Sequence, residues 1–142
     1  MAQNIRGLRC SLDYYRLADF LKYLSKQAWV FYIPWCMLDG LITITDYNAS
    51  TRDLQALDKH RIWELELQCY PYNTDKTKIS NYQDFSISNC ACYLLYFDCG
   101  YLEIYIKQQY EFQQFWNYLM SIGAKDLVIV TAVNDTRTQF TV

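Results

Sequence analysis

The chain has 142 residues, of which 52% are hydrophobic and 20% charged, and its formal net charge is −2. This composition excludes an intrinsically disordered chain, and the acidic balance disfavours a nucleic-acid-binding protein, which must neutralise many phosphates. A chain of this length buries roughly two thirds of its unfolded surface, so its core needs neither a metal nor a disulfide. We expect one domain over residues 1–142 and no cofactor.

The first half of the chain predicts one long helix between strands. Apolar side chains recur at helical spacing over residues 14–24, and Ser11 or Asp13 can cap the start of this helix. Pro34 is expected to break a buried strand, and Asp39-Gly40 is typical of a turn. In chain order we expect a strand at 5–10, the helix, strands at 28–33 and 41–45, and a short helix at 50–57.

The second half predicts strands around a second long helix. Residues 61–70 alternate, and Glu64, Glu66 and Gln68 are expected on a solvated face. Gly100 is expected to supply the left-handed residue of a hairpin turn, and Gly123 to end the second helix. The expected elements are strands at 61–70, 92–97, 101–106 and 126–133, a polar loop within 71–82, one or two helical turns within 81–88, and a helix at 109–122.

Hairpin signals between neighbouring strands predict a mostly antiparallel sheet. The two main helices, after Asp13 and at 109–122, are expected to pack on one face of that sheet. The fold class is therefore α+β, in a single two-layer domain.

Three of the six cysteines lie in the apolar run "SNCACYLLYFDCGYLEIYIK" at residues 88–107. Structural zinc sites use paired ligands of the CxxC kind, in which two residues separate the cysteines. Only one residue separates Cys90 from Cys92, and Cys99 follows at the far end of a strand. A buried hairpin with free thiols is therefore favoured over a metal site. A cysteine nucleophile would need a base, and His60, the sole histidine, is expected to face solvent.

Few residues suit other common active sites. The four glycines are far apart, which excludes a phosphate loop and a dinucleotide fingerprint. Paired carboxylates leave a hydrolase open as a third hypothesis, although solvated strand faces carry such pairs routinely. These pairs are Glu64/Glu66, Asp53/Asp58 and Asp126/Asp135.

Tyrosine is unusually abundant, with fourteen copies, and half-exposed tyrosines commonly anchor partners. We expect Tyr70, Tyr72 and Tyr82, which surround a polar loop, to contact a partner. The segment "VNDTRTQFTV" at residues 133–142 adds three candidate partner-binding residues, Asn134, Asp135 and Arg137. The structural alternative is that Arg137 pairs with an aspartate of the same domain while Phe140 packs.

The segments "IRGLRCSLDYYRLADFLKYL" and "MSIGAKDLVIVTAVNDTRT" resemble a family of small uncharacterised proteins of low-GC Gram-positive bacteria, classed as a domain of unknown function. The motifs that carry this resemblance are Arg6-Gly7 and Asn134-Asp135-Thr136-Arg137-Thr138, and residues 36–82 show no recognisable match. The resemblance implies a single cytoplasmic domain and transfers no catalytic residue.

The leading hypothesis is a non-enzymatic protein-binding module, such as a small inhibitor, an immunity factor or a phage anti-defence factor. The alternative is a small-ligand or nucleotide-binding protein, in which aromatic rings stack a base and Arg9 or Arg137 holds an anion. We expect a protein partner rather than nucleic acid, and no membrane span. An exposed edge strand would also allow a homodimer, and the lack of a secretory signal predicts the cytoplasm.

Overall fold

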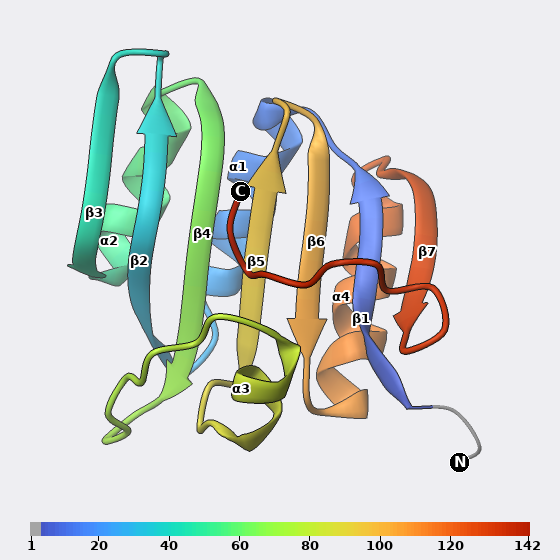
Figure 1. Ribbon diagram of the computed structural model, residues 1–142. Coiled ribbons are helices and arrows are strands. Elements are labelled where there is room, and N and C mark those ends of the chain that lie inside the picture. Colours follow the sequence, from blue (N-terminus) through green and yellow to red (C-terminus); the bar gives the residue numbers. More distant parts are fainter. Residues whose placement is uncertain (1–3) are drawn as a thin grey trace.

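The computed structural model describes residues 4–142 and contains a seven-stranded sheet (Figure 1). The strand order is β3-β2-β4-β5-β6-β1-β7, and every pairing is antiparallel. The elements are β1 (Ile5–Ser11), α1 (Tyr14–Ser25), β2 (Trp29–Leu38), β3 (Ile42–Ala49), α2 (Thr51–Ala56), the 3-10 turn η1 (Leu57–Lys59), β4 (Ile62–Pro71), α3 (Tyr82–Ile87), β5 (Cys92–Phe97), β6 (Tyr101–Ile106), α4 (Gln109–Ser121) and β7 (Lys125–Thr131). The expected α+β class with an antiparallel sheet is confirmed.

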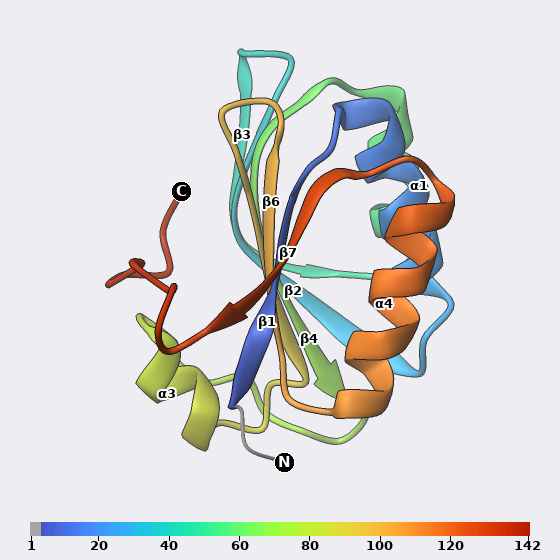
Figure 2. The same ribbon diagram turned by 90° about the vertical axis from the view of Figure 1, so that its right-hand side faces the viewer.

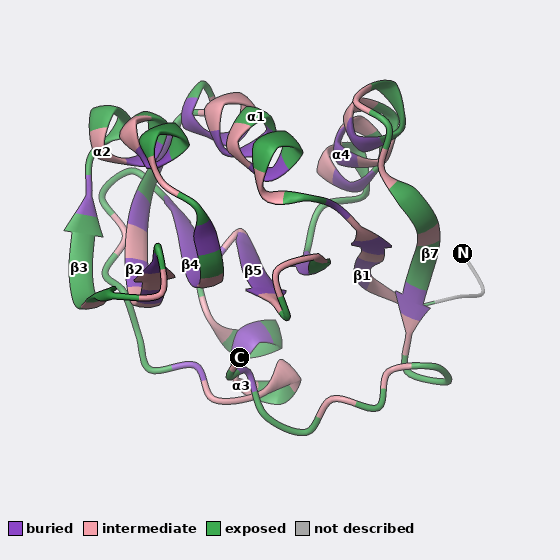
Figure 3. Ribbon diagram, turned by 90° about the horizontal axis from the view of Figure 1, so that it is seen from above, coloured by how far each residue is buried: buried purple, intermediate pink, exposed green. Residues whose placement is uncertain are grey.

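Both faces of the sheet are covered. Helices α1, α2 and α4 lie on one face, whereas α3 and the C-terminal segment lie on the other (Figures 2 and 3). From the sequence, two main helices on one face and a total of two layers were expected. The structure adds α2 to that face and a third layer on the opposite one.

Each face has its own apolar core. The helix side is filled by residues such as Leu17, Phe20 and Phe115, which are fully buried. The opposite side holds an aromatic cluster in which Phe140 of the C-terminal segment packs on Tyr93 and Tyr105, with ring centroids 4.8 and 4.4 Å apart. The C-terminal segment is therefore part of the packed structure.

The expected helix ends are confirmed where local chemistry determines them. Asp13 accepts a hydrogen bond from the Arg16 amide, and Ser50 forms a capping box with Asp53 at the start of α2. Gly123 follows the last residues of α4 with φ +88°, as a left-handed helix-ending residue should.

Two strand predictions need correction. Pro34 does not break its strand: β2 runs through it, and the register with β4 shifts between Tyr32 and Trp35 to accommodate the missing donor. Strand β4 has no solvated face at its centre, because Glu66 and Gln68 are only 8% and 3% exposed beneath the third layer.

The β5–β6 hairpin also turns differently from expectation. Asp98 and Cys99 adopt the left-handed conformation, with φ values of 52° and 54°, whereas Gly100 does not. The Gly100 amide donates to the Phe97 carbonyl at 3.2 Å, which closes the turn. Two consecutive left-handed residues give the turn the twist that an antiparallel hairpin favours.

Among residues 4–142, no helix is long and apolar enough to cross a membrane.

Candidate ligand-binding site

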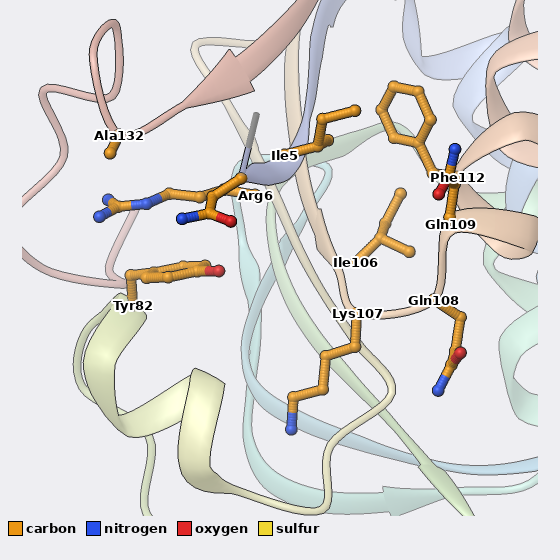
Figure 4. Close-up of a pocket in the computed structure, with 10 residues that line it drawn as sticks. Ile5, Arg6, Tyr82, Ile106, Lys107, Gln108, Gln109, Phe112 and Ala132 are labelled. Atoms are coloured by element: carbon orange, nitrogen blue, oxygen red, sulfur yellow. The ribbon is translucent and has the colours of Figure 1, made fainter. Parts of the chain in front are cut away.

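A pocket of about 430 Å³ opens where β1 begins and where β6 passes into α4 (Figure 4). Its volume lies within the range of small-molecule sites. The lining residues are Asn4, Ile5, Arg6, Tyr82, Ile106, Lys107, Gln108, Gln109, Phe112 and Ala132. The apolar members come from the strand ends and α4, and the polar members surround them.

Arg6 stacks on Tyr82 at one side of this pocket (Figure 4). The guanidinium carbon lies 4.1 Å from the Tyr82 ring centroid, a distance suited to a cation–π contact. One guanidinium nitrogen also donates to Asp135 Oδ2 at 3.0 Å. The arginine is therefore fixed in position by an aromatic ring and a carboxylate.

Lys107 is the second cation of the pocket, and it lies at the end of β6. Its ammonium group donates to the Ser88 carbonyl and lies 5.0 Å from the Phe85 ring centroid. Partial burial lowers the pKa of Lys107, because the charged form loses hydration. Among residues 4–142, the pocket lining contains two cations and no aspartate or glutamate.

The start of α4 contributes to the same side of the pocket. Gln108 is the N-cap residue and makes no side-chain capping hydrogen bond, so no cap covers the first-turn amides. The positive end of the α4 dipole lies at this helix start and therefore at the pocket. Lys107 and the first-turn amides of α4 are thus groups that can attract an anion, whereas the charge of Arg6 is offset by Asp135.

Three of the six predicted partner-binding residues meet in one network beside this pocket. Asp135 is completely buried and accepts hydrogen bonds from the Tyr105 hydroxyl and the Arg137 amide, both at 3.1 Å, in addition to the bond from Arg6. Tyr82 joins through its contact with Arg6. The acid that pairs with Arg137 is Glu103, at 2.6 Å, rather than the aspartate suggested by the structural alternative.

The other predicted residues lie elsewhere. Asn134 stabilises the turn after β7, where its side chain accepts from the Thr131 amide at 2.7 Å. The Tyr70 ring is 1% exposed, and its hydroxyl donates to Gln68 at 2.5 Å. Tyr72 is 63% exposed. The three tyrosines therefore form no common surface, and Tyr70 offers no ring to a partner.

The cysteines behave as interior residues. Cys10, Cys36, Cys69, Cys90 and Cys92 are buried, and Cys99 is half-buried in the hairpin turn. Burial raises the pKa of Cys10 and of Cys36 to about 12, so these thiols stay protonated at neutral pH. Within the part of the chain that the structure describes, no group of three or more His, Cys, Asp or Glu residues is placed to hold a metal ion.

Sequence reasoning missed Arg6 and Lys107 as site residues. The pairing of Arg6 with Tyr82 joins residues far apart in the chain, which no local pattern reveals. A weak signal was present at Gln108, because a strand passes directly into a helix there without the usual Ser, Thr, Asp or Asn cap.

Fold and site define an antiparallel α+β protein whose pocket is lined by two cationic side chains, Arg6 and Lys107. The chain belongs to the family described as "Protein of unknown function (DUF2691)", whose model matches residues 44–141. That match includes most of residues 36–82, in which no motif was recognised, as well as the Asn134–Thr138 motif; it begins after Arg6-Gly7.

A similar protein is "Uncharacterized protein YncE" of Bacillus subtilis (strain 168), which is 31% identical over 78 residues. The alignment covers 55% of this chain and 51% of that protein, so the match spans about half of the relative's length. No solved structure matches the chain.

Proposed function

We propose that this protein is a non-enzymatic binding protein that holds a small anionic ligand between Arg6, Tyr82 and Lys107. The observation that carries the proposal is that two cations and an uncapped helix start converge on one pocket of about 430 Å³, which has no acidic lining residue in the described part of the chain. Anions bind well at such positions, because backbone amides, the helix dipole and side-chain charges act together.

A mononucleotide is the ligand class that uses most of these features. Its phosphate would be held by Lys107 and the first-turn amides of α4, and its base would lie against the Arg6–Tyr82 stack. From the sequence, Arg9 or Arg137 was expected to hold the anion. Both of those side chains instead donate to Glu103, and Arg6 donates to Asp135, so Lys107 is the lining cation without a carboxylate partner among residues 4–142.

The test is a thermal-shift and native mass spectrometry series with AMP, GMP and inorganic phosphate, with the corresponding nucleosides as uncharged controls. We expect the nucleotides to raise the melting temperature and the nucleosides to have a smaller effect, because the phosphate supplies the charge. Lys107→Gln should weaken nucleotide binding roughly tenfold, the size of one charge-assisted hydrogen bond. Lys59→Gln, an exposed lysine of η1 that is not in the pocket lining, should leave binding unchanged.

Nucleotides that leave the melting temperature unchanged, together with spectra containing only the protein mass, would contradict the proposal. Equal binding by wild type and Lys107→Gln would contradict the assigned site.

A second candidate function is the protein-binding module expected from the sequence, and the exposed edge at β3 favours it. Leu41 is 88% exposed at the tip of the β2–β3 hairpin, and Ile42 and Tyr47 of the edge strand are 45% and 42% exposed. An extended segment of a partner could add to this edge, as in other strand-addition complexes. Under this candidate, the protein would act in the cytoplasm as an inhibitor, an immunity factor or an anti-defence factor. A homodimer through an edge strand is part of the same candidate.

Affinity purification distinguishes this candidate. A partner that is retained by wild type and by Ile87→Glu, but lost with Leu41→Glu, would support this candidate. Ile87 is a suitable control because it is similarly exposed (82%) but lies on α3, away from the β3 edge. A partner retained by both variants would rule out the β3 edge.

A further inference from the structure

A second cavity, of about 380 Å³, lies on the face of the sheet that carries the C-terminal segment. Its floor is formed by side chains of β2, β4 and β5, and its roof by residues 76–80 and 139–141. These two roof segments are joined, because the Phe140 amide donates to the Ser80 carbonyl at 2.8 Å. The cavity therefore has defined walls on both sides.

Glu66 contributes a buried carboxylate to the floor of this cavity. The residue is 8% exposed, and one carboxylate oxygen accepts a hydrogen bond from the Val142 amide at 3.3 Å. Among residues 4–142, no cationic side chain lies within ion-pair distance of Glu66. Buried carboxylates are normally paired, because desolvation of an isolated charge is costly.

The surroundings of Glu66 explain why the protein itself does not neutralise it. Arg137 acts on the charge of Glu66, but the Nε of Arg137 donates to Glu103. Lys76 lies at the edge of the cavity with its ammonium 3.5 Å from Asp46 and 3.9 Å from the Tyr32 ring centroid. Lys78 is exposed at the same edge.

Three aromatic side chains contribute to the walls of the cavity. Tyr32, Tyr93 and Phe140 all line the cavity, and the ring centroids of the last two lie 4.8 Å apart in an edge-to-face arrangement. Aromatic faces attract organic cations, and their apolar surface accommodates an alkyl chain. A buried carboxylate that has no ion-pair partner among residues 4–142 and lies beside aromatic rings is complementary to an amine.

We propose that this cavity binds a small molecule with a primary ammonium group, which donates to the Glu66 carboxylate while its alkyl part lies against Tyr32, Tyr93 and Phe140. The site is separate from the anion pocket, with which it shares no lining residue, and it does not depend on the function proposed there. The bound ammonium supplies the counter-charge that Glu66 lacks. Burial is the main reason why the pKa of Glu66 is raised, in agreement with this geometry.

The test is isothermal titration of the full chain with n-butylammonium, with n-butanol as the uncharged control and butyrate as the charge-reversed control. We expect butylammonium to bind at least ten times more tightly than butanol, and butyrate not to bind. Glu66→Gln keeps the size of the side chain and an acceptor for the Val142 amide, and it should reduce butylammonium binding to the level of butanol.

Glu64→Gln is the matched control, because Glu64 is two residues away on β4, accepts from the Trp35 indole and does not line the cavity. This variant should bind butylammonium like wild type. Circular dichroism and urea unfolding of both variants establish that they are folded. Lys107→Gln, which disables the anion pocket, should have no effect on butylammonium binding. Failure of one proposal can therefore be distinguished from failure of the other.

The proposal is overturned if wild type binds butylammonium no better than butanol, or if folded Glu66→Gln retains the tight binding. It is also overturned if butylammonium binds only after Lys78→Met, because the cavity would then be occupied by the Lys78 ammonium.

Discussion

Arg137 in the C-terminal segment donates from Nε to Glu103 Oε1 at 2.6 Å, in the middle of strand β6. The other oxygen of the same carboxylate accepts from Arg9 Nε of β1 at 2.9 Å. The Glu103 side chain is only 7% exposed, so the two arginines together neutralise a buried acid. This relationship ties the last residues of the chain to the sheet, close to the Asp135 network beside the anion pocket.

The two partners of this ion pair should differ in importance. Glu103→Gln leaves two arginines without their shared acid, and we expect it to lower the free energy of unfolding by about 3 kcal/mol. Arg137→Met leaves Glu103 paired with Arg9 and should cost less, about 1–2 kcal/mol. Urea unfolding measures both, with the exposed Arg52→Met as a control that should change nothing. The reverse order would show that Arg9 does not share the charge.

Most of the fold follows from local patterns in the sequence, and the exceptions have a common cause. The helix after Asp13, the Ser50 cap and the Gly123 stop depend on residues within one or two turns. Glu66 and Gln68, by contrast, alternate with apolar residues as on a solvated strand, and they are buried by a C-terminal segment about seventy residues later in the chain. Alternation in the sequence shows which side chains are polar, but it does not show whether a segment distant in the chain will cover them.

The candidate site was predictable only in part for the same reason. Asp135 and Arg137 were identified from a short distinctive segment, whereas their partners Arg6 and Glu103 lie on β1 and β6. Tyr70 was selected because tyrosine is common at half-exposed positions, but the adjacent loop covers it, and the Thr77 amide donates to its hydroxyl at 3.2 Å. Tertiary contacts decided which residues became accessible.

Gly7 lies where β1 approaches β6 too closely for a side chain. A Cβ atom at this position would overlap the carbonyl oxygen of Ile104, which is fixed in the sheet. We expect Gly7→Ala to lower the free energy of unfolding by about 3 kcal/mol, because the backbones of two paired strands must separate. Gly100→Ala is the control: the nearest atom to its added Cβ is the Asp98 carbonyl oxygen at 3.8 Å, so we expect little change. Equal stability of the two variants in urea would contradict the close packing of β1 and β6.

Glu111 in the first turn of α4 predicts a pH dependence of stability. Its Oε1 is buried with no hydrogen-bond partner among the described residues, and burial raises the pKa of the carboxyl group. The folded state therefore holds the proton more tightly than the unfolded state, and the free energy of unfolding falls as the pH rises from the ordinary carboxyl pKa through the raised one. Glu111→Gln removes this loss and should be about 1 kcal/mol more stable than wild type at pH 7.

The comparison for Glu111 is urea unfolding at pH 4 and at pH 7. The advantage of Glu111→Gln should be smaller at pH 4, where the wild-type carboxyl is largely protonated in both states. Glu66 titrates in both proteins, so its contribution is common to wild type and variant. Asp75→Asn, in an exposed loop, serves as a charge-matched control. An advantage of equal size at both pH values would assign the effect to packing and not to ionisation.

The six thiols should separate into one accessible group and five protected ones. Cys99 lies in the β5–β6 turn with φ +54° and is half-buried, whereas the other five are buried. Burial raises the pKa of the buried thiols, for Cys10 and Cys36 to about 12, so they lack both the thiolate and the access that a disulfide reagent needs. We expect Ellman's reagent at pH 8 to modify one thiol rapidly in the native protein and six in guanidinium chloride.

Cys99→Ser should abolish the rapid reaction and leave five thiols in the denatured protein. Rapid modification of two or more thiols in the native wild type would show that the cysteine-containing strands open readily, against the interior role that both cores assign to them.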